Sequence, residues 1–316
     1  MPAQARSAYH EGVSETILVV LIGRKDTGQT DPYQLLQEEV AVAEGARAGV
    51  GVEIVFAPGF DHLRVIRKRL TGAGAPPLRA VVVEPGSVSS MGLILKELKG
   101  RTGLVLLNAW SPEVEEYARG WGSGLPYGTV STDHVRIGEI QGRQLAAVLP
   151  AGGQVLCVTG PLRSSAAVER LQGMKSVLRP DITLAEAEAG QWTEPDGIVA
   201  FESWYALHKA RRFTIDAIAA QSDDLAMGAR SACAAVPTAA HREMLRAARF
   251  LGVDACPQFG RRLVDSGELT ASVITPATTG EAIRGLQRFW RSGQPLPLKA
   301  FTEPKPYPPS SAGPPT

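Results

Sequence analysis

The chain has 316 residues, of which 44% are hydrophobic and 21% are charged. This length and composition are typical of a globular protein with about two domains. The 33 Lys and Arg residues nearly cancel the 32 Asp and Glu residues, so the sequence lacks the excess of positive charge that favours nucleic-acid binding. Three cysteines, far apart in the chain, exclude a disulfide framework and a cysteine-rich zinc site.

The N-terminal segment favours neither a membrane span nor an export signal. The longest early apolar run, Ile17–Ile22, is far shorter than the roughly 20 residues that cross a bilayer. Glu11 and Glu15 precede it in place of a basic region, and a charged loop follows it in place of a cleavage site. With Met1 as the true start we expect a cytoplasmic protein, and with a different start a periplasmic one.

From residue 16 onward, apolar runs of strand length alternate with helical stretches. The first helix illustrates the signals: Asp31 can accept hydrogen bonds from free N–H groups, Pro32 suits the first turn, and Gln34 completes a capping box. The predicted strands are Thr16–Ile22, Val52–Ala57, Arg79–Glu84, Gly103–Asn108, Thr129–Thr132, Gln154–Thr159, Ile182–Ala189, Thr214–Gln221, Phe250–Asp254 and Leu269–Thr275. Helices are predicted between them, the last at Thr279–Trp290. Such alternation predicts βαβ units and parallel sheets that are buried on both faces.

The predicted elements form two halves of similar size, residues 16–130 and 131–275. Open α/β sheets bind ligands at the carboxyl ends of their strands, and clefts between domains are preferred small-molecule sites. Residues 1–15 precede the first predicted strand as an N-terminal extension. Residues 304–316 are dominated by Pro, Ser and Gly, so we expect a disordered tail there.

The motifs for phosphate binding and for catalysis are incomplete or missing. Gly23–Thr30 follows a strand and nearly spells the phosphate-binding loop GxxxxGK[ST], but Gln29 stands where the lysine is needed. The glycine-rich segment Gly120–Gly124 precedes no predicted helix, so it does not match the dinucleotide fingerprint. The sequence contains no HExxH, GxSxG or CxxC. We therefore expect no cofactor, no metal and no enzymatic activity.

The histidines and cysteines support the same interpretation. The five histidines show no i,i+4 pairing with a second metal ligand, so each is interpreted as a solvated or capping residue. Cys157 and Cys233 are predicted to be small core residues. An enzyme that uses Cys256 or Asp254 is a less favoured alternative, because no histidine partner is evident.

Polar and aromatic side chains recur at the points where the predicted strands end. Any one of them is as well explained by a cap or a turn, and Asp223 in particular is expected to be an N-cap. Together, however, fixed polar groups and aromatic rings at one rim predict a site for a neutral, hydroxyl-rich ligand. The set comprises Asp31, Tyr33, Asn108, Trp110, Arg163, Ser164, Trp192, Ser222, Asp223, Asp254 and Thr275.

Four segments in order resemble the type I periplasmic binding proteins, close to the ribose-binding and related sugar-binding proteins and to the ligand-sensing part of LacI-type repressors. The segments are VSTDHVRIG from Val130 to Gly138, GPLRSSAAVER from Gly160 to Arg170, AQSDDLAMG from Ala220 to Gly228, and LGVD from Leu251 to Asp254 with DSGELTASV from Asp265 to Val273. The resemblance covers about residues 16–303.

This resemblance implies two Rossmann-like α/β lobes with parallel sheets, joined by three hinge crossovers near Val130, Pro276 and Ala300. The first lobe would hold residues 16–130 and 277–299, and the second residues 131–276 and 300–303. A sugar or polyol would be bound between the lobes as they close, as in a substrate-binding protein of a sugar ABC transporter or in a sensor. An ABC permease or a signalling protein would be its partner.

The family motifs place ligand contacts on Tyr33, Asn108, Trp192, Ser222, Asp254 and Thr275. The sequence departs from the family pattern at three points. Asn108-Ala109 stands where sugar binders have an Asp-Arg pair, Val168 where they have an arginine, and Ser222 where they have an asparagine. Arg163 is a candidate replacement for the missing guanidinium groups. The alternative is a protein–protein signalling module that kept the fold and lost the sugar site.

Overall fold

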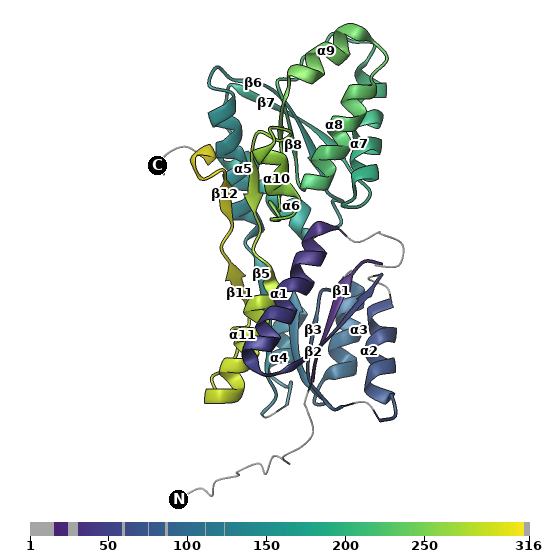
Figure 1. The fold of residues 1–316 in the computed structure, drawn as a ribbon, viewed down its shortest axis with the longest axis vertical. Coiled ribbons are helices and arrows are strands. Elements are labelled where there is room, and N and C mark those ends of the chain that lie inside the picture. Colours follow the sequence, from purple (N-terminus) through teal and green to yellow (C-terminus); the bar gives the residue numbers. More distant parts are fainter. Residues whose placement is uncertain are drawn as a thin grey trace, which may run out of the picture. The chain divides into compact units, whose positions relative to one another are not determined.

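The computed structural model describes residues 16–24, 31–58, 61–74, 76–85, 88–110, 112–122 and 124–312. The chain divides into two compact units (Figure 1). The described part of unit 1 lies within residues 16–24, 38–129 and 279–299, and that of unit 2 within 31–37, 130–278 and 300–312. Residues 31–37, which the sequence analysis placed in the first lobe, thus group with unit 2.

Unit 1 is built on a sheet of order β11-β5-β4-β3-β1-β2, in which β11 is contributed by residues grouped with unit 2. Its strands are β1 (Thr16–Ile22), β2 (Gly51–Ala57), β3 (Leu78–Val83), β4 (Gly103–Leu107), β5 (Tyr127–Thr132) and β11 (Ala300–Thr302). The pairs β1–β2, β1–β3, β3–β4 and β5–β11 are parallel. The helices around this sheet are α1 (Pro32–Ala48), α2 (His62–Thr71), α3 (Val88–Leu98), α4 (Pro112–Ala118) and α11 (Thr278–Ser292). The start of α1, up to Gln37, and Thr278 of α11 are grouped with unit 2.

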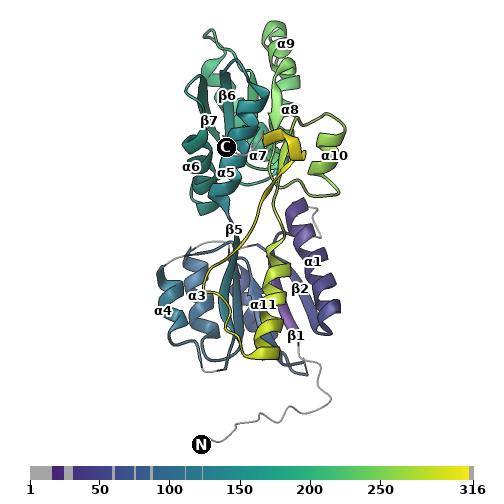
Figure 2. The ribbon, with the colours of Figure 1, turned by 90° about the vertical axis from the view of Figure 1, so that its left-hand side faces the viewer.

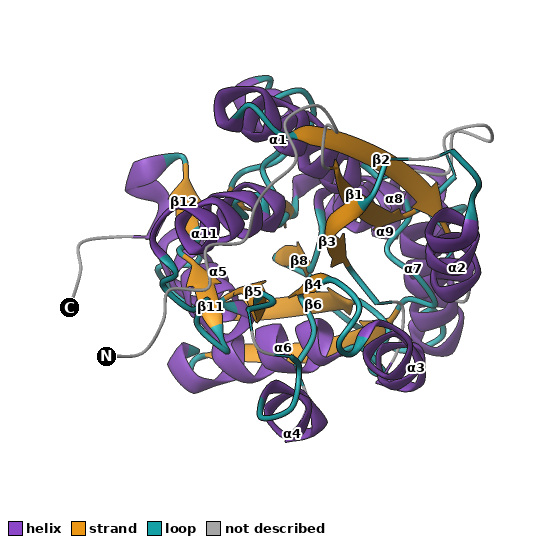
Figure 3. Cartoon of the chain, turned by 90° about the horizontal axis from the view of Figure 1, so that it is seen from below, coloured by secondary structure: helices purple, strands orange, loops and turns teal. Residues whose placement is uncertain are grey.

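Helices cover this sheet on both faces. Leu18 and Val20 of β1 pack with residues of α2, α3 and α4, while Ile17 and Val19 are fully buried on the opposite side of the same strand. On that side α1 and α11 lie together (Figures 2 and 3). Because both faces are buried, the strands are continuous apolar runs, which is the pattern that predicted them.

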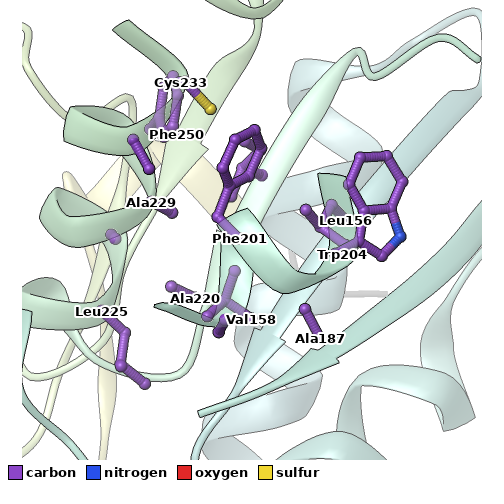
Figure 4. Close-up of a cluster of buried hydrophobic side chains, with 14 of the residues drawn as sticks. Leu156, Val158, Ala187, Phe201, Trp204, Ala220, Leu225, Ala229, Cys233 and Phe250 are labelled. Carbon is purple, nitrogen blue, oxygen red and sulfur yellow. The ribbon is translucent and has the colours of Figure 1, made fainter. Parts of the chain in front are cut away.

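Unit 2 has a parallel four-stranded sheet of order β7-β6-β8-β9. Its strands are β6 (Gly153–Thr159), β7 (Ile182–Glu188), β8 (Ala217–Ala220) and β9 (Arg249–Leu251). Around them are α5 (His134–Val148), α6 (Ser165–Val177), α7 (Glu194–His208), α8 (Asp223–Ala235), α9 (Ala239–Ala247) and α10 (Gly260–Asp265). Figure 4 shows the core on one face, where Phe201 of α7 and Leu225 of α8 meet Leu156 and Val158 of β6.

The C-terminal segment corrects the sequence analysis. Residues 305–312 are not disordered: β12 (Lys305–Tyr307) pairs antiparallel with β10 (Ser272–Ile274), and the 3-10 helix Pro309–Ala312 contacts α5. The Tyr307 hydroxyl also donates a hydrogen bond to Asp265 Oδ1 at 2.7 Å. A proline-rich segment can do this because an edge strand tolerates proline, whose missing N–H leaves no central ladder bond unmade. Residues 313–316 lie outside the described residues.

Other elements also differ from prediction: the strands expected at Thr214–Gln221 and Leu269–Thr275 are shortened to β8 and β10. The strand expected at Phe250–Asp254 ends at Leu251, and Asp254 makes only an isolated bridge with Ile274. The helix α9 was not predicted at all. No helix among the described residues is both long and apolar enough to span a membrane.

Close packing of α5 against α6 yields a test of the fold. A methyl group at Gly173 of α6 would collide with the backbone carbonyl of Val135 in α5, whereas Gly92 of α3 has open space around it. We expect Gly173→Ala to destabilise the protein by about 1–3 kcal/mol through overpacking. The control Gly92→Ala should instead stabilise it by up to about 1 kcal/mol, because alanine is the better helix former. Urea unfolding followed by circular dichroism measures both, and equal effects would contradict the close helix packing.

Candidate functional site

Arg170 of α6 is the centre of a polar cluster at the carboxyl ends of the unit 2 strands. Its side chain is 7% exposed. Its Nε donates to His134 Nδ1 at 3.4 Å, and its Nη1 donates to the carbonyl of Gln221. Its Nη2 lies 3.8 Å from Asp254 Oδ1, and its guanidinium carbon lies 5.2 Å from the centre of the Trp192 ring. One cation therefore connects segments that follow β5, β7, β8 and β9.

Trp192 follows β7 and is half-buried. Its six-membered ring lies so close to Gly160 that any side chain at this position would collide with the ring. Gly160 directly follows β6. The ring is thus supported by Gly160 and contacted by Arg170, an arrangement that fixes its orientation.

Asp254 lies in a strained turn. Among the described residues, three non-glycine residues have positive φ: Asn108 (48°), Asp254 (101°) and Ala255 (41°). Two of these three were predicted site residues, and strain of this kind concentrates at functional sites. The Asp254 side chain is 15% exposed, so it does not lie at an open rim as expected. Burial raises the pKa of Asp254, and the nearby Arg170 opposes the rise.

The expectation that Asp223 is the N-cap of α8 is wrong. Ser222 is the N-cap of α8, since its Oγ accepts from the backbone N–H of Leu225 at 3.1 Å. Asp223 is the first helical residue and is 1% exposed. Its carboxylate accepts from the backbone N–H of Ala255 at 2.8 Å and from the Ser272 hydroxyl at 2.6 Å. Asp223 is therefore a buried anchor for the segment that carries Asp254.

Asp224 lies near several other acidic residues of unit 2. Burial, with the negative charges of Asp31, Asp254 and Glu194, raises the pKa of Asp224 to about 8. At neutral pH its carboxyl group is therefore mainly protonated and can donate a hydrogen bond as well as accept one. The sequence analysis did not single out this residue.

Unit 1 contributes two of the predicted residues. The Asn108 side-chain amide donates to Glu84 Oε1 at 3.2 Å. Trp110 is half-buried against the core of unit 1, and Lys299 Nζ lies 5.2 Å from the centre of its ring. Both residues follow β4, as the sequence indicated.

The remaining predicted residues belong to unit 2. The Tyr33 hydroxyl donates to the Pro276 carbonyl at 3.3 Å. Thr275 is buried, and its N–H donates to the Asp254 carbonyl at 3.2 Å. Arg163 is exposed, and its guanidinium donates to the Gly190 carbonyl at 3.1 Å. The buried guanidinium beside Asp254 is that of Arg170.

Arg170 and His134 were missed by sequence reasoning. A signal for Arg170 existed, because it shares the spacing of the buried helix positions Ala167, Leu171 and Met174. His134 was interpreted as solvated or capping, yet it is only 5% exposed. His62 is also buried and contacts the Ala57 carbonyl, so the same interpretation is wrong there.

Among the described residues, no group of three or more His, Cys, Asp or Glu side chains is arranged to hold a metal ion. All three cysteines are buried. Burial is the main cause that raises the pKa of the Cys256 thiol, and nearby carboxylates raise it further.

Comparison with known proteins gives a consistent result. A family profile described as a periplasmic binding protein domain matches residues 80–282. The chain belongs to the periplasmic binding protein family. A xylitol-binding protein from Mycolicibacterium smegmatis is 26% identical over 156 residues, which are 48% of this chain and 41% of that protein.

Solved structures show the fold. An ABC transporter solute-binding protein from Actinobacillus succinogenes with bound D-allose matches with a TM-score of 0.76 at 15% identity, covering 94% of this chain and 99% of that chain. One from Bacillus halodurans with bound myo-inositol matches with a TM-score of 0.73 at 18% identity, covering 96% and 98%. The chain, with its parallel α/β units, thus has the predicted type I periplasmic binding protein fold.

The raised pKa of Asp224 predicts how stability depends on pH. The folded protein holds a proton on Asp224 up to about pH 8, whereas the unfolded chain loses it near pH 4. The resulting stabilisation is present below pH 4 and is lost as the pH rises through 8, by at most about 1.4 kcal/mol per pH unit.

Asp224→Asn removes this titration. We therefore expect the variant to lose less stability than the wild type between pH 5 and pH 9, as measured by urea unfolding. The comparison at pH 5, where Asp224 is protonated in the folded state, is the internal control. Parallel pH profiles for the two proteins would contradict the assignment.

Proposed function

We propose that this protein binds a small polyhydroxylated molecule, a sugar or polyol, as the substrate-binding protein of an ABC-type transporter or as a sensor. The observation that carries this proposal is the cluster in which Arg170 lies between the Trp192 ring and the Asp254 carboxylate. The family membership and the sugar- and polyol-binding relatives support it. No step in this function requires a reaction.

The chemistry of the cluster suits such a ligand. The Trp192 ring can cover the C–H face of a sugar or polyol. The Asp254 carboxylate accepts hydrogen bonds, and its 3.8 Å separation from Arg170 Nη2 exceeds a hydrogen bond, so this pair is not locked together. A ligand hydroxyl can accept from the guanidinium and donate to the carboxylate at the same time.

We further propose that one ligand is contacted by both units, through Asn108 and Trp110 of unit 1 and through the cluster of unit 2. Binding would then change the relation of the two units by movement at the connecting segments. A permease or a signalling protein would recognise the ligand-bound form.

A thermal-shift screen with xylitol, D-allose and myo-inositol tests the proposal. A ligand at 100 times its dissociation constant stabilises the folded state by about 2.7 kcal/mol. A clear upward shift with at least one member of a panel of sugars and polyols supports sugar or polyol binding. No shift with any compound would favour the signalling module that kept the fold and lost the site.

Asp254→Asn should weaken binding. Asparagine keeps the shape of the side chain and tolerates positive φ, but it removes the negative charge. A hydrogen bond to a charged group is worth roughly 1.5–3 kcal/mol. We expect affinity to fall about tenfold to 150-fold in calorimetric titration. Asp216→Asn is the matched control, because Asp216 accepts from the backbone N–H of Gln154 at the start of β6, away from the cluster. Equal affinities of wild type and Asp254→Asn would place the site elsewhere.

Trp192 supplies an independent test. Ligand binding should change the fluorescence of Trp192, and Trp192→Phe should remove this change while keeping an aromatic face. Trp192→Ala removes the face itself, so we expect its affinity to fall about two- to tenfold below that of Trp192→Phe, as a ring contact is worth about 0.5–1.5 kcal/mol. If both variants bind as the wild type does, the ring does not touch the ligand.

A further inference from the structure

His134 is a buried histidine with an unusual pattern of hydrogen bonds. It is the first residue of α5 and is 5% exposed. Its Nδ1 receives the Nε–H of Arg170 at 3.4 Å. Arginine has no acceptor, so Nδ1 must carry the lone pair and the proton must lie on Nε2. Nε2 is itself buried and has no hydrogen-bond partner among the described residues.

A purely structural role does not explain this pattern. A buried N–H without an acceptor is costly, and an apolar side chain of similar volume would fill the space without that cost. The feature that an apolar side chain would not supply is the Nδ1 acceptor for Arg170. Burial, with the positive charge of Arg170, holds the pKa of His134 well below its usual range, so the ring stays neutral and Nδ1 stays an acceptor.

The other contacts of the Arg170 guanidinium show why the orientation of this side chain matters. Its Nε is held by His134 and its Nη1 by the Gln221 carbonyl. These two contacts direct Nη2 towards Asp254 and place the guanidinium over the Trp192 ring. An arginine side chain has many rotamers, and fixing one before the ligand arrives lowers the entropic cost of binding.

We propose that His134 is a positioning residue that, through its Nδ1 acceptor, sets Arg170 in the orientation in which Asp254 and Trp192 bind the ligand. The inference rests on the proposed function of this cluster. His134 follows the last residue of β5 by two positions, and the boundary between the two units falls within β5. His134 therefore also ties the ligand-binding residues to a strand that connects the units.

Two substitutions at His134 test whether the Nδ1 acceptor matters rather than the volume of the ring. The Asn side-chain oxygen reaches about as far as Nδ1, whereas Gln places its amide about as far as Nε2. We expect His134→Gln to bind about tenfold more weakly than the wild type and His134→Asn to recover most of that loss. In an Arg170→Gln background, His134→Gln should add less than a twofold loss, because the two residues act as one unit. Calorimetric titration with xylitol, D-allose and myo-inositol measures each variant.

Nitrogen-15 NMR of the ligand-free protein tests the same inference without a ligand. We expect the His134 ring as the neutral tautomer with its proton on Nε2, and slow hydrogen exchange at Arg170 Nε in the wild type and in His134→Asn but not in His134→Gln. A proton on Nδ1, or equal exchange in all three proteins, would overturn the inference.

The outcomes distinguish this inference from the proposed function. If the wild type binds a probe and His134→Gln binds it equally well, the positioning role is wrong and the proposed function stands. If the wild type binds none of the three probes and no other sugar or polyol, the proposed function is wrong. The NMR result then decides whether His134 sets the orientation of Arg170.

Discussion

The buried carboxylate of Asp223 determines where Asp254 lies. It binds the backbone N–H of Ala255 and the hydroxyl of Ser272, and it lies so close to Gly252 and Gly260 that a side chain at either glycine would collide with it. The segment from 252 to 260 therefore packs closely around the Asp223 side chain. The positive φ values of Asp254 and Ala255 are strained, and these hydrogen bonds offset the strain.

The charges of the site residues interact more strongly than those of the surface ion pairs. Exposed pairs such as Arg179 with Asp181 contribute little, because water screens both partners. Arg170 and Asp254 are 7% and 15% exposed, so their interaction is screened much less. The same burial raises the pKa values of Asp254 and Asp224. Burial thus makes the cluster around Arg170 and Asp254 sensitive to the charge and the hydrogen-bonding groups of a bound molecule.

Sequence reasoning recovered the parallel α/β architecture because strands buried on both faces are long apolar runs, as Ile17–Leu21 shows. It recovered local contacts as well: Asp31 accepts from the Gln34 N–H at 2.8 Å, as the capping signal predicted. It missed α9, a short helix of polar mean composition in which Leu245 is the buried residue. It also missed β12, since pairing with β10 depends on a contact between residues about 30 positions apart. It missed Arg170 because the partners of this side chain come from four segments that are far apart in the sequence.

The residues of the unit 2 cluster are arranged before any ligand binds. In unit 2, His134 contacts Arg170, Arg170 contacts Trp192, and backbone hydrogen bonds hold the turn that carries Asp254, so this geometry exists before a ligand arrives. In unit 1, the Asn108 side-chain amide donates to Glu84, and the backbone of Asn108 has a positive φ. Pre-organised groups bind with less loss of conformational entropy. The existing arrangement of the unit 2 cluster would therefore lower the entropic cost of the proposed binding.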